Sequence, residues 1–400
     1  MGSADPCRMG DIMNTRMKVL LLPAAPMLGA LMLVAPVGAA ARPHGPLVPH
    51  MPAVVHAAAA RPHVITGTHQ NTYVSTTGTD AANTCSNKAK PCATITYAES
   101  KTAGGGTINV ANGTYHQSVD LTQPIHLLGQ SMGSTILDGT NVDYTLGGYY
   151  GIIGINNTSG VAGAIAINNV TVTHPYITAA EANLIQSPVD IANYDQKTGD
   201  KIYVTSVTLG PAQDEVDFPG IGYYSLNALS TNSVKQSRAH GMYTAYFDEG
   251  SGGPTSYSKD LAYNLAGDLY QGTYYPAAGV WALADTSGSQ SVTANNNQFK
   301  FFNGWGIVGQ AGYSGGNCTN NVCTGGLTIN TNHNFFDLYK APAGDGVAAI
   351  QAYVSANDSL TGNFNNSSGI VFNPDLAISV VNFGGVVNVT DTHNTITVLN

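Results

Sequence analysis

The sequence predicts an all-β protein built as a single-stranded right-handed parallel β-helix with a short N-terminal helix cap. Short apolar segments recur at steps of 25 to 38 residues, the range of repeat architectures whose units cannot bury an apolar face alone. Within each segment apolar and polar residues alternate as in strands, and no helical period is sustained across the body of the chain. Gly and Asn are frequent at the turns, and parallel coils stacked about 4.8 Å apart place like residues on like.

The clearest copy of the repeat is 292–307, VTANNNQFKFFNGWGI, in which we expect Phe299 and Ile307 to point inward. The copies are anchored at Ile167, Val204, Leu229, Ser256, Ala294, Ile329 and Leu360. Asparagines at matching offsets are expected to form a ladder of side-chain amides, namely Asn232, Asn297, Asn332 and Asn363. WD40 and kelch propellers need longer periods, of about 40 to 50 residues. An antiparallel sandwich is the alternative fold.

The amino-acid composition limits the classes of partner that the protein is expected to bind. Charged residues are only 10% of the chain, against roughly 25% in ordinary domains. Hydrophobic residues make up 43% and recur in register, which argues against disorder. The net charge of −9 argues against a nucleic-acid partner, which would require a basic stripe. The excess of acidic over basic residues fits an acidic extracellular protein.

The N-terminal part of the sequence predicts an export signal followed by a linker. Residues 1–41 combine a short basic flank, Arg16 and Lys18, with a proline-broken apolar run and small residues at a cleavage site, as in signal peptides. A retained membrane anchor is the alternative. Residues 42–67 are rich in Ala, Pro and His and predict an extended linker. The β-helix domain is expected over 68–400, in a secreted protein without a membrane contact after cleavage.

Four cysteines of the mature chain form two close pairs, Cys85 with Cys92 and Cys318 with Cys323. Behind an export signal, such pairs predict two local disulfides. A zinc site would need tighter spacings and four converging ligands. Residues 94–102 are the best helix candidate in the mature chain, and we expect a short cap over the first coil.

The N-terminal block also carries a family resemblance. The run from Tyr73 to Gly129, with YVSTTGTD, PCATITYA and GGGTINVANGTYHQSVDLTQPIHLLG, resembles the start of secreted pectin-lyase-like β-helix proteins. The "G-T-Y" turn at Gly113 and the "L-x-G" step, here Leu128-Gly129, are part of it. The resemblance covers roughly residues 72–140 by motif and the rest by repeat style. It implies the fold, whereas activity differs across the superfamily, which includes lyases, hydrolases, epimerases, tailspikes and proteins without known catalysis.

The motifs of the superfamily's enzymes are mostly missing. Ala239-His240-Gly241 is the nearest match to the G-H-G of polygalacturonase-like members, and no Asp-Asp pair occurs. The acidic stretch with Asp214, Glu215 and Asp217, followed by Arg238, is the nearest match to the aspartate cluster and catalytic arginine of calcium-dependent pectate lyases. We therefore expect no cofactor; Ca²⁺ stays open, without a motif to support it.

Stacking gives a sharper site hypothesis. An offset of eleven residues from the anchors reaches Glu215, His240 and Trp305, and an offset of twelve reaches Asp268. Stacking would then place Glu215 and His240 on neighbouring coils, Asp268 one further on, and Trp305 beyond. Two carboxylates two coils apart are separated by roughly 9–10 Å, close to the spacing of inverting glycosidases. We expect Glu215, His240 and Asp268 to be catalytic. The expected substrate-binding residues are Trp305, Arg238, Tyr243 and Tyr270, whose rings would face sugars.

The alternatives at these positions are ordinary ones. Acidic residues in turns are usually solvated, His240 can cap a turn, Arg238 can form a salt bridge, and Trp305 can be core. Two functions therefore stay open. One is a secreted hydrolase or lyase acting on an extracellular polysaccharide, and the other is a non-catalytic glycan-binding or cell-envelope β-helix.

Overall fold

The computed structural model describes residues 67–140, 142, 151–174, 188–211, 220–270, 273–284, 289–312, 326–338, 348–354, 358–372, 376–382 and 384–399. The expected signal peptide, 1–41, and nearly all of the expected linker, 42–67, lie outside the described residues. Cys318, Cys323 and Glu215 lie outside them too.

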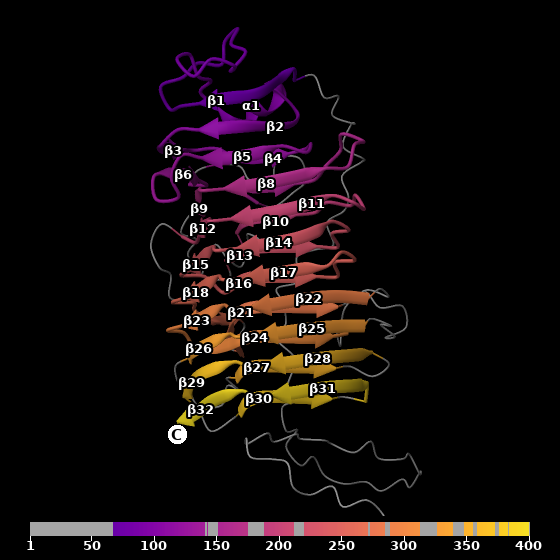
Figure 1. Ribbon diagram of the computed structural model, residues 1–400. Helices are drawn as coiled ribbons and strands as arrows, with labels where there is room; N and C mark the ends of the chain where they lie inside the picture. Colours follow the sequence, from indigo (N-terminus) through magenta and orange to yellow (C-terminus); the bar gives the residue numbers. More distant parts are fainter. Residues whose placement is uncertain are drawn as a thin grey trace, which may run out of the picture.

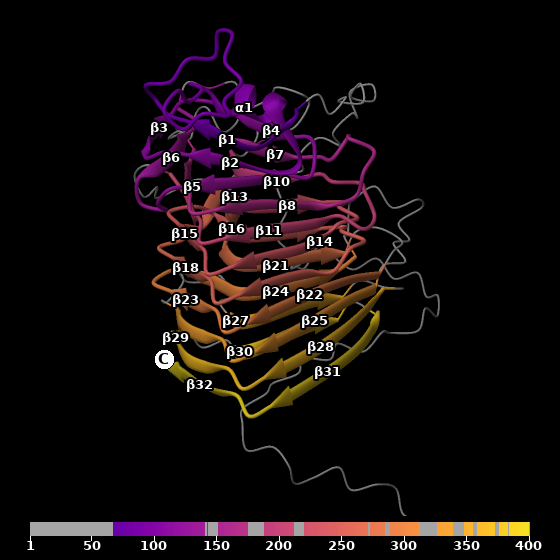
Figure 2. The same cartoon turned by 45° about the horizontal axis from the view of Figure 1, so that its top comes forward.

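The chain winds into a right-handed parallel β-helix, which confirms the predicted fold (Figures 1 and 2). Each coil passes through three sheets in a fixed order, which we call the first, second and third sheets. They contain 11, 10 and 9 strands, and every pair within them is parallel, as from β11 to β14. We name the corners between sheets accordingly, as the 1–2, 2–3 and 3–1 corners.

The first sheet runs the length of the molecule and contains β1 (His69–Val74), β2 (Thr102–Val110), β5 (His126–Gly129), β8 (Ala164–Asn168), β11 (Lys201–Thr205), β14 (Thr231–Lys235), β17 (Thr255–Ser258), β22 (Ser289–Asn295), β25 (Gly326–Asn332), β28 (Ser359–Asn365) and β31 (Val386–Thr392).

The second sheet has shorter strands and contains β3 (Gly113–Tyr115), β6 (Thr135–Asp138), β9 (Thr171–Thr173), β12 (Thr208–Leu209), β15 (Arg238–His240), β18 (Leu261–Tyr263), β23 (Gln298–Lys300), β26 (Phe335–Leu338), β29 (Ser368–Phe372) and β32 (Thr395–Leu399).

The third sheet contains β4 (Val119–Leu121), β7 (Ile153–Ile155), β10 (Val189–Asn193), β13 (Ile221–Leu226), β16 (Thr244–Glu249), β21 (Ala277–Ala284), β24 (Gly304–Ala311), β27 (Ala348–Val354) and β30 (Leu376–Asn382). A separate antiparallel hairpin, β19 (Asp268–Tyr270) with β20 (Thr273–Tyr275), extends from the 2–3 corner.

The N-terminal end is closed as predicted by one short helix, α1 (Ile95–Lys101). Thr94 is its N-cap, and the Thr94 hydroxyl accepts a hydrogen bond from the backbone N–H of Tyr97 at 3.2 Å, which satisfies a donor of the first turn. The helix packs on β1, β2 and β4. Cys85 and Cys92 form the predicted disulfide beside it, with Cα atoms 5.1 Å apart.

Side chains from all three sheets fill the interior of the coil. Phe299 and Ile307 are fully buried there, as predicted, and Phe299 stacks on Phe336 with ring centroids 5.2 Å apart. A glycine faces each ring: a Cβ on Gly279 would lie 2.2 Å from Phe299, and one on Gly306 would lie 2.3 Å from Phe336. The large rings therefore fit because the facing strand carries no side chain at that point.

The 1–2 corner is the most regular feature of the coil. One residue per coil turns it in the left-handed conformation, with φ between 48° and 58° at Asn169, Ser206, Gln236, Asn296 and His393, for example. The next residue accepts, through its side chain, a hydrogen bond from the backbone N–H of the same position one coil earlier. These bonds run from Val207 to Ser237 (3.3 Å), Ser237 to Asp260 (2.8 Å), Asp260 to Asn297 (3.0 Å), Asn297 to Asn334 (3.0 Å) and Ser367 to Asn394 (2.6 Å).

A ladder of side-chain hydrogen bonds therefore exists, as predicted, but most of the asparagines predicted to form it lie elsewhere. Asn297 belongs to the ladder at the 1–2 corner. Asn232 instead lies inside the coil, where it accepts a hydrogen bond from Asn193 at 2.8 Å. Asn363 and Asn332 bond to asparagines of neighbouring coils, Asn330 and Asn366.

The predicted anchors also need correction. Ile167, Val204 and Ala294 share one register position, as predicted. The coils between and after them place Val234, Tyr257, Thr331 and Phe364 at that position instead of Leu229, Ser256, Ile329 and Leu360. Ile329 and Leu360 lie two and four residues from the correct positions, on the same face of the strand, so alternation alone does not exclude them. Leu229 precedes β14, and Ser256 lies one residue away on the opposite face of its strand.

Replacement of Phe299 by Ala tests the packing of the core. Phe299→Ala should lower the free energy of unfolding by about 3–5 kcal/mol, because a buried ring leaves a cavity. Phe335→Ala is the matched control, since Phe335 lies on the neighbouring coil and is 40% exposed; it should cost less than about 1 kcal/mol. Denaturant unfolding measures both, and equal losses would contradict the packing described.

Replacement of Asp260 tests the ladder. Asp260 is buried, and burial raises its pKa to about 7. Hydrogen bonds from the backbone of Ser237 and Ser258 act in the opposite direction and lower the pKa, but burial outweighs them. Since the unfolded value is lower, at 3.8, the folded chain binds this proton more tightly, and stability falls as pH rises from about 4 to about 7. At the same position, Asn297 and Asn334 donate to carbonyl oxygens of the preceding coil.

Asp260→Asn should therefore stabilise the protein at pH 8, on the order of 2–4 kcal/mol from a shift of this size, and have little effect near pH 4. Thermal melts across this range measure it. The pH dependence should become shallower without vanishing, because burial also raises the pKa of Asp248 to about 6. A stabilisation of equal size at both pH values would contradict the assignment.

Candidate functional site

The 2–3 corner differs from the other corners in the length of its segments. Six consecutive coils cross it through 174–188, 210–220, 241–243, 264–276, 301–303 and 339–347. Segments that leave a rigid solenoid on one side commonly build its binding surface. Among the described residues, a buried imidazole and a buried carboxylate, His174 and Asp190, lie at this corner, whereas Asp195 and Asp200 are buried at the 3–1 corner and Asp260 at the 1–2 corner.

The strongest polar contact at this corner joins His174 to Asp190. Nδ1 of His174 lies 2.8 Å from Oδ1 of Asp190, and both side chains are fully buried. Burial raises the pKa of Asp190, and the contact with His174, the backbone of Gly210 and the charge of His240 oppose that increase. A carboxylate bonded to one imidazole nitrogen fixes the ring and its tautomer.

Two glycines bring both histidines to the ends of the same segment. A Cβ on Gly220 would lie 2.8 Å from Nε2 of His174, and a Cβ on Gly210 would lie 3.2 Å from Nε2 of His240. Gly210 and Gly220 flank the acidic stretch that contains Glu215. The absence of a side chain at both glycines is what allows the imidazoles to approach the backbone this closely.

His240 ends β15 and is half-buried. Its ring stacks on Tyr263 of the next coil, with centroids 5.3 Å apart and an interplanar angle of 26°. Of the influences on the pKa of Asp190, the charge of His240 is the smallest, whereas His174 contacts the carboxylate directly. His240 is the more accessible of the two.

Aromatic side chains cover the outer face of the third sheet next to this corner. Tyr224 stacks on Phe247 (5.1 Å), Phe247 contacts Trp281 (5.1 Å), and Trp281 meets Trp305 edge-on (6.4 Å). Tyr243 joins the same group through Trp281, at 6.3 Å. These rings form a second apolar cluster outside the coil, and Trp305 and Tyr243 are only 4% and 3% exposed.

Of the three residues predicted to be catalytic, the structure describes His240, which ends β15, and the backbone of Asp268, which begins β19; both lie at the 2–3 corner, on consecutive coils. The placement of Glu215, and of the side chains of Asp268 and Tyr270, lies outside the described residues. Arg238 is exposed at the start of β15.

The equal-offset row itself is wrong in register. His240 pairs with Tyr263, and Tyr263 pairs with Lys300, all on the second sheet. Trp305 pairs with Ala278 and Ala348 on the third sheet. The corner segments differ in length from coil to coil, so equal counts along the chain do not reach equal positions in space.

The sequence analysis missed His174 and Asp190. The signal for Asp190 was an acidic residue within VDIAN, a strand that is otherwise apolar or neutral and is buried throughout. A carboxylate in such a strand requires a partner, because an isolated buried charge is strongly unfavourable. The partner is sixteen residues upstream, and only the fold shows that the two are adjacent.

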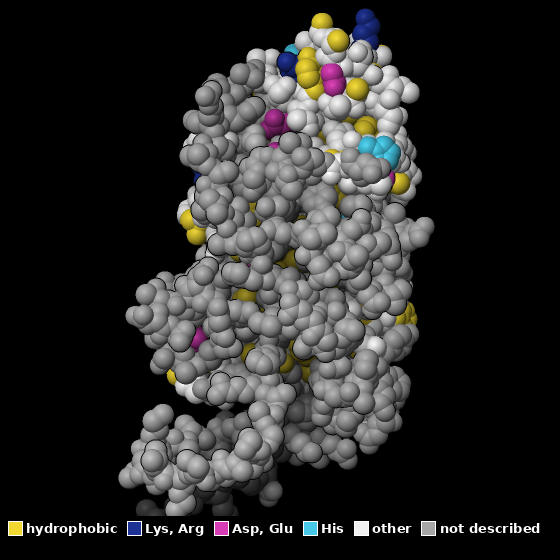
Figure 3. All heavy atoms as spheres, turned by 180° about the vertical axis from the view of Figure 1, so that it is seen from behind, with side chains coloured by type: hydrophobic (Ala, Val, Ile, Leu, Met, Phe, Trp, Pro, Cys, Tyr) yellow, Lys and Arg dark blue, Asp and Glu magenta, His cyan; other side chains and the backbone are white. Residues whose placement is uncertain are grey.

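Within the described residues, no group of three or more His, Cys, Asp or Glu side chains forms a metal-binding cluster. Nor is any helix of that part long and apolar enough to cross a membrane. On the face shown in Figure 3, the described basic side chains are scattered and form no stripe.

Comparisons with known proteins add one finding. No protein-family model matches the chain, and no curated protein matches it. Among solved structures, the chain is similar to a pectin methylesterase from carrot, with 10% sequence identity and a TM-score of 0.33. The match covers 82% of this chain and 88% of that one.

Removal of the Asp190 carboxylate tests the buried pair. Asp190→Ala should lower the free energy of unfolding by about 3–5 kcal/mol, because it leaves a buried imidazole without its anion. Asp138→Ala is the matched control, since Asp138 lies 3.4 Å from His116, whose side chain is 62% exposed. The exposed pair should contribute less than about 1 kcal/mol. Equal effects in denaturant unfolding would show that the buried pair has no special role in stability.

Proposed function

We propose that this protein is a secreted polysaccharide-active β-helix protein, a glycan hydrolase or lyase whose active site is at the 2–3 corner. The observation that carries the proposal is the buried His174–Asp190 pair together with the half-buried His240, with the two imidazoles packed against the glycines at the two ends of the segment that contains Glu215. Secretion is part of the proposal and rests on the signal-like residues 1–41 and on the disulfide at Cys85.

In this proposal His240 is the acid or base that meets the substrate, since it is half-buried, whereas His174 is fully buried. Histidine is suited to proton transfer near neutral pH. Asp190 and His174 are positioning residues: the Asp190 carboxylate orients His174 and stabilises positive charge on either ring. Glu215 and Asp268 are proposed as the carboxylates that act with His240.

The chemistry differs between the two reaction classes. In a hydrolase, one group protonates the glycosidic oxygen while a carboxylate activates water or attacks the sugar. In a lyase, a base removes a proton next to the carboxylate of a uronate, and an acid assists the leaving oxygen. Arg238, Tyr243 and Tyr270 are proposed to bind the chain. Tyr243 and Trp305 are so buried, at 3% and 4% exposure, that Tyr243→Ala and Trp305→Ala would test packing as well as binding.

The test is product release from a panel of plant, algal and bacterial polysaccharides, with His240→Gln as the key variant. If His240 transfers a proton, turnover should fall about 10²- to 10⁴-fold, with an unchanged melting temperature because the ring is half-exposed. Glu215→Gln and Asp268→Asn should lower turnover similarly.

His126→Gln is the matched control, because His126 is also half-buried but lies on the first sheet; it should keep full activity. Full activity of His240→Gln on a substrate that the wild type degrades would overturn the role of His240. Binding of a glycan by a wild type that degrades none would favour the non-catalytic glycan-binding or cell-envelope function.

A further inference from the structure

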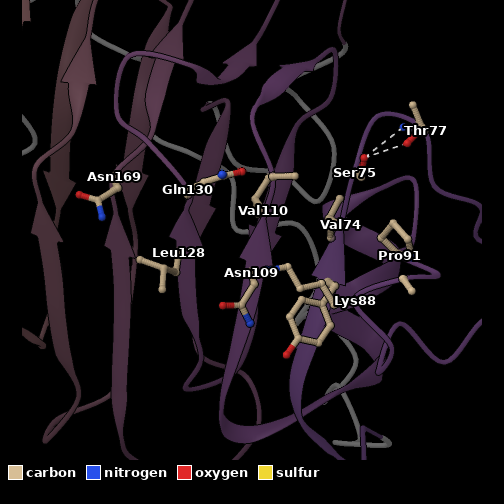
Figure 4. A pocket seen from close by; sticks show the side chains of 14 residues that line it. Val74, Ser75, Thr77, Lys88, Pro91, Asn109, Val110, Leu128, Gln130 and Asn169 are labelled. Atoms are coloured by element: carbon tan, nitrogen blue, oxygen red, sulfur yellow. Dashed lines mark hydrogen bonds between the residues drawn. The ribbon is translucent and has the colours of Figure 1, made fainter.

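A second feature with the properties of a binding site lies at the N-terminal end of the molecule, on the outer face of the first sheet. A pocket of about 630 Å³ opens there, within the range of small-molecule sites, roughly 300–1,000 Å³. Its walls come from β1, β2, β5, Asn169 and the loop closed by the Cys85–Cys92 disulfide (Figure 4).

The floor of the pocket is a row of outward side chains on neighbouring strands. Tyr73 pairs with Asn109, and Asn109 pairs with Leu128. At about 4.8 Å per strand, the row is roughly 10 Å long. Tyr73 is half-buried and Val74 beside it is 1% exposed, so the tyrosine ring lies on the pocket side of the strand.

Two amides in the pocket are held in place by the backbone. Nδ2 of Asn109 donates to the carbonyl of Thr72 at 3.2 Å, and Oε1 of Gln130 accepts from the N–H of Asn112 at 3.2 Å. These bonds orient Oδ1 of Asn109 and Nε2 of Gln130 as the groups for a ligand hydroxyl. A tyrosine face with nearby amides is suited to a sugar ring.

The charge of the pocket is opposite to that of the whole protein. The 14 lining residues include Lys88 and no carboxylate, whereas the chain carries a net charge of −9. Lys88 is exposed in the disulfide loop, with Lys90 two residues away. Figure 4 shows Lys88 and Asn109 among the side chains that line the pocket, and because Lys88 is exposed its ammonium is available to an anion held over the row.

We propose that this pocket is a non-catalytic binding site for an acidic oligosaccharide, distinct from the 2–3 corner. A uronate ring lies on Tyr73, its carboxylate meets the ammonium of Lys88, and its hydroxyls bond to Asn109 and Gln130. Such a site holds the protein on an acidic polysaccharide independently of any cleavage at the 2–3 corner, and raises the local concentration of chain there.

Calorimetric titration of the wild type with tri-galacturonate tests the site, with galactotriose as the neutral counterpart. Tri-galacturonate should bind with an affinity that falls between about 20 and about 500 mM salt, because the Lys88 contact is exposed to solvent. Galactotriose should bind about tenfold more weakly or not at all. Tyr73→Ala should weaken tri-galacturonate about tenfold, and Lys88→Gln about fivefold with loss of the salt dependence.

The matched controls lie on the same face of the first sheet outside the pocket. Tyr203, 39% exposed on β11, and Lys235, exposed on β14, supply Tyr203→Ala and Lys235→Gln, which should bind like the wild type. Lys88 lies in an exposed loop, so Lys88→Gln should keep the fold. It therefore remains informative even if Tyr73→Ala fails to fold.

Three outcomes would overturn the proposal: no binding at about 1 mM ligand, equal affinity of Lys88→Gln and the wild type, or equal loss in the control variants. A sulfated trisaccharide that binds with the same affinity as tri-galacturonate would still support a site for anionic saccharides. If the sulfated trisaccharide binds and tri-galacturonate does not, the assignment to uronates is overturned. His240→Gln should bind tri-galacturonate in this pocket like the wild type, so the two sites are tested separately.

Discussion

Alignment of each coil on the previous one is the constraint on which the rest of this structure depends. Strand hydrogen bonds alone would allow slippage by two residues. The 1–2 corner prevents this, because a left-handed residue and the side-chain acceptor after it occur at one fixed point of the coil. A shifted coil would leave buried backbone N–H groups without their acceptors, at a cost of roughly 1–3 kcal/mol each. Every other corner can then vary in length.

That freedom is used mainly at the 2–3 corner. Segments of between three and fifteen residues cross it, while the strands on both sides keep their pairing. β10 and β15 hold Asp190 and His240 in fixed positions, and His174 directly follows β9. The proposed chemistry is therefore placed on a rigid support, with catalytic diversity left to the loops. The cluster of aromatic rings on the third sheet reinforces the same side of the molecule.

Much of the fold could be predicted from the sequence, because period-2 alternation and a repeat of about thirty residues leave few alternatives. The cap helix, the Cys85–Cys92 disulfide and the inward direction of Phe299 followed from local patterns. Register did not, because Ile329 and Thr331 lie on the same face of one strand and only the pairing of Thr331 with Ala294 distinguishes them. The catalytic residues predicted from the sequence stay a prediction, because Glu215 and the side chain of Asp268 lie outside the described residues. Asp190 and His174 are adjacent through the fold, and no spacing in the sequence reports it.

The location of bound glycan tests the central claim most directly. Hydrogen–deuterium exchange of the wild type, with and without a glycan that it cleaves or binds, reports which segments the ligand protects. Protection at the 2–3 corner over the coils from β12 to β24, including 241–243 and 264–276, is the predicted result. Protection confined to the first coils, or spread along the first sheet with none at the 2–3 corner, would contradict an active site at that corner.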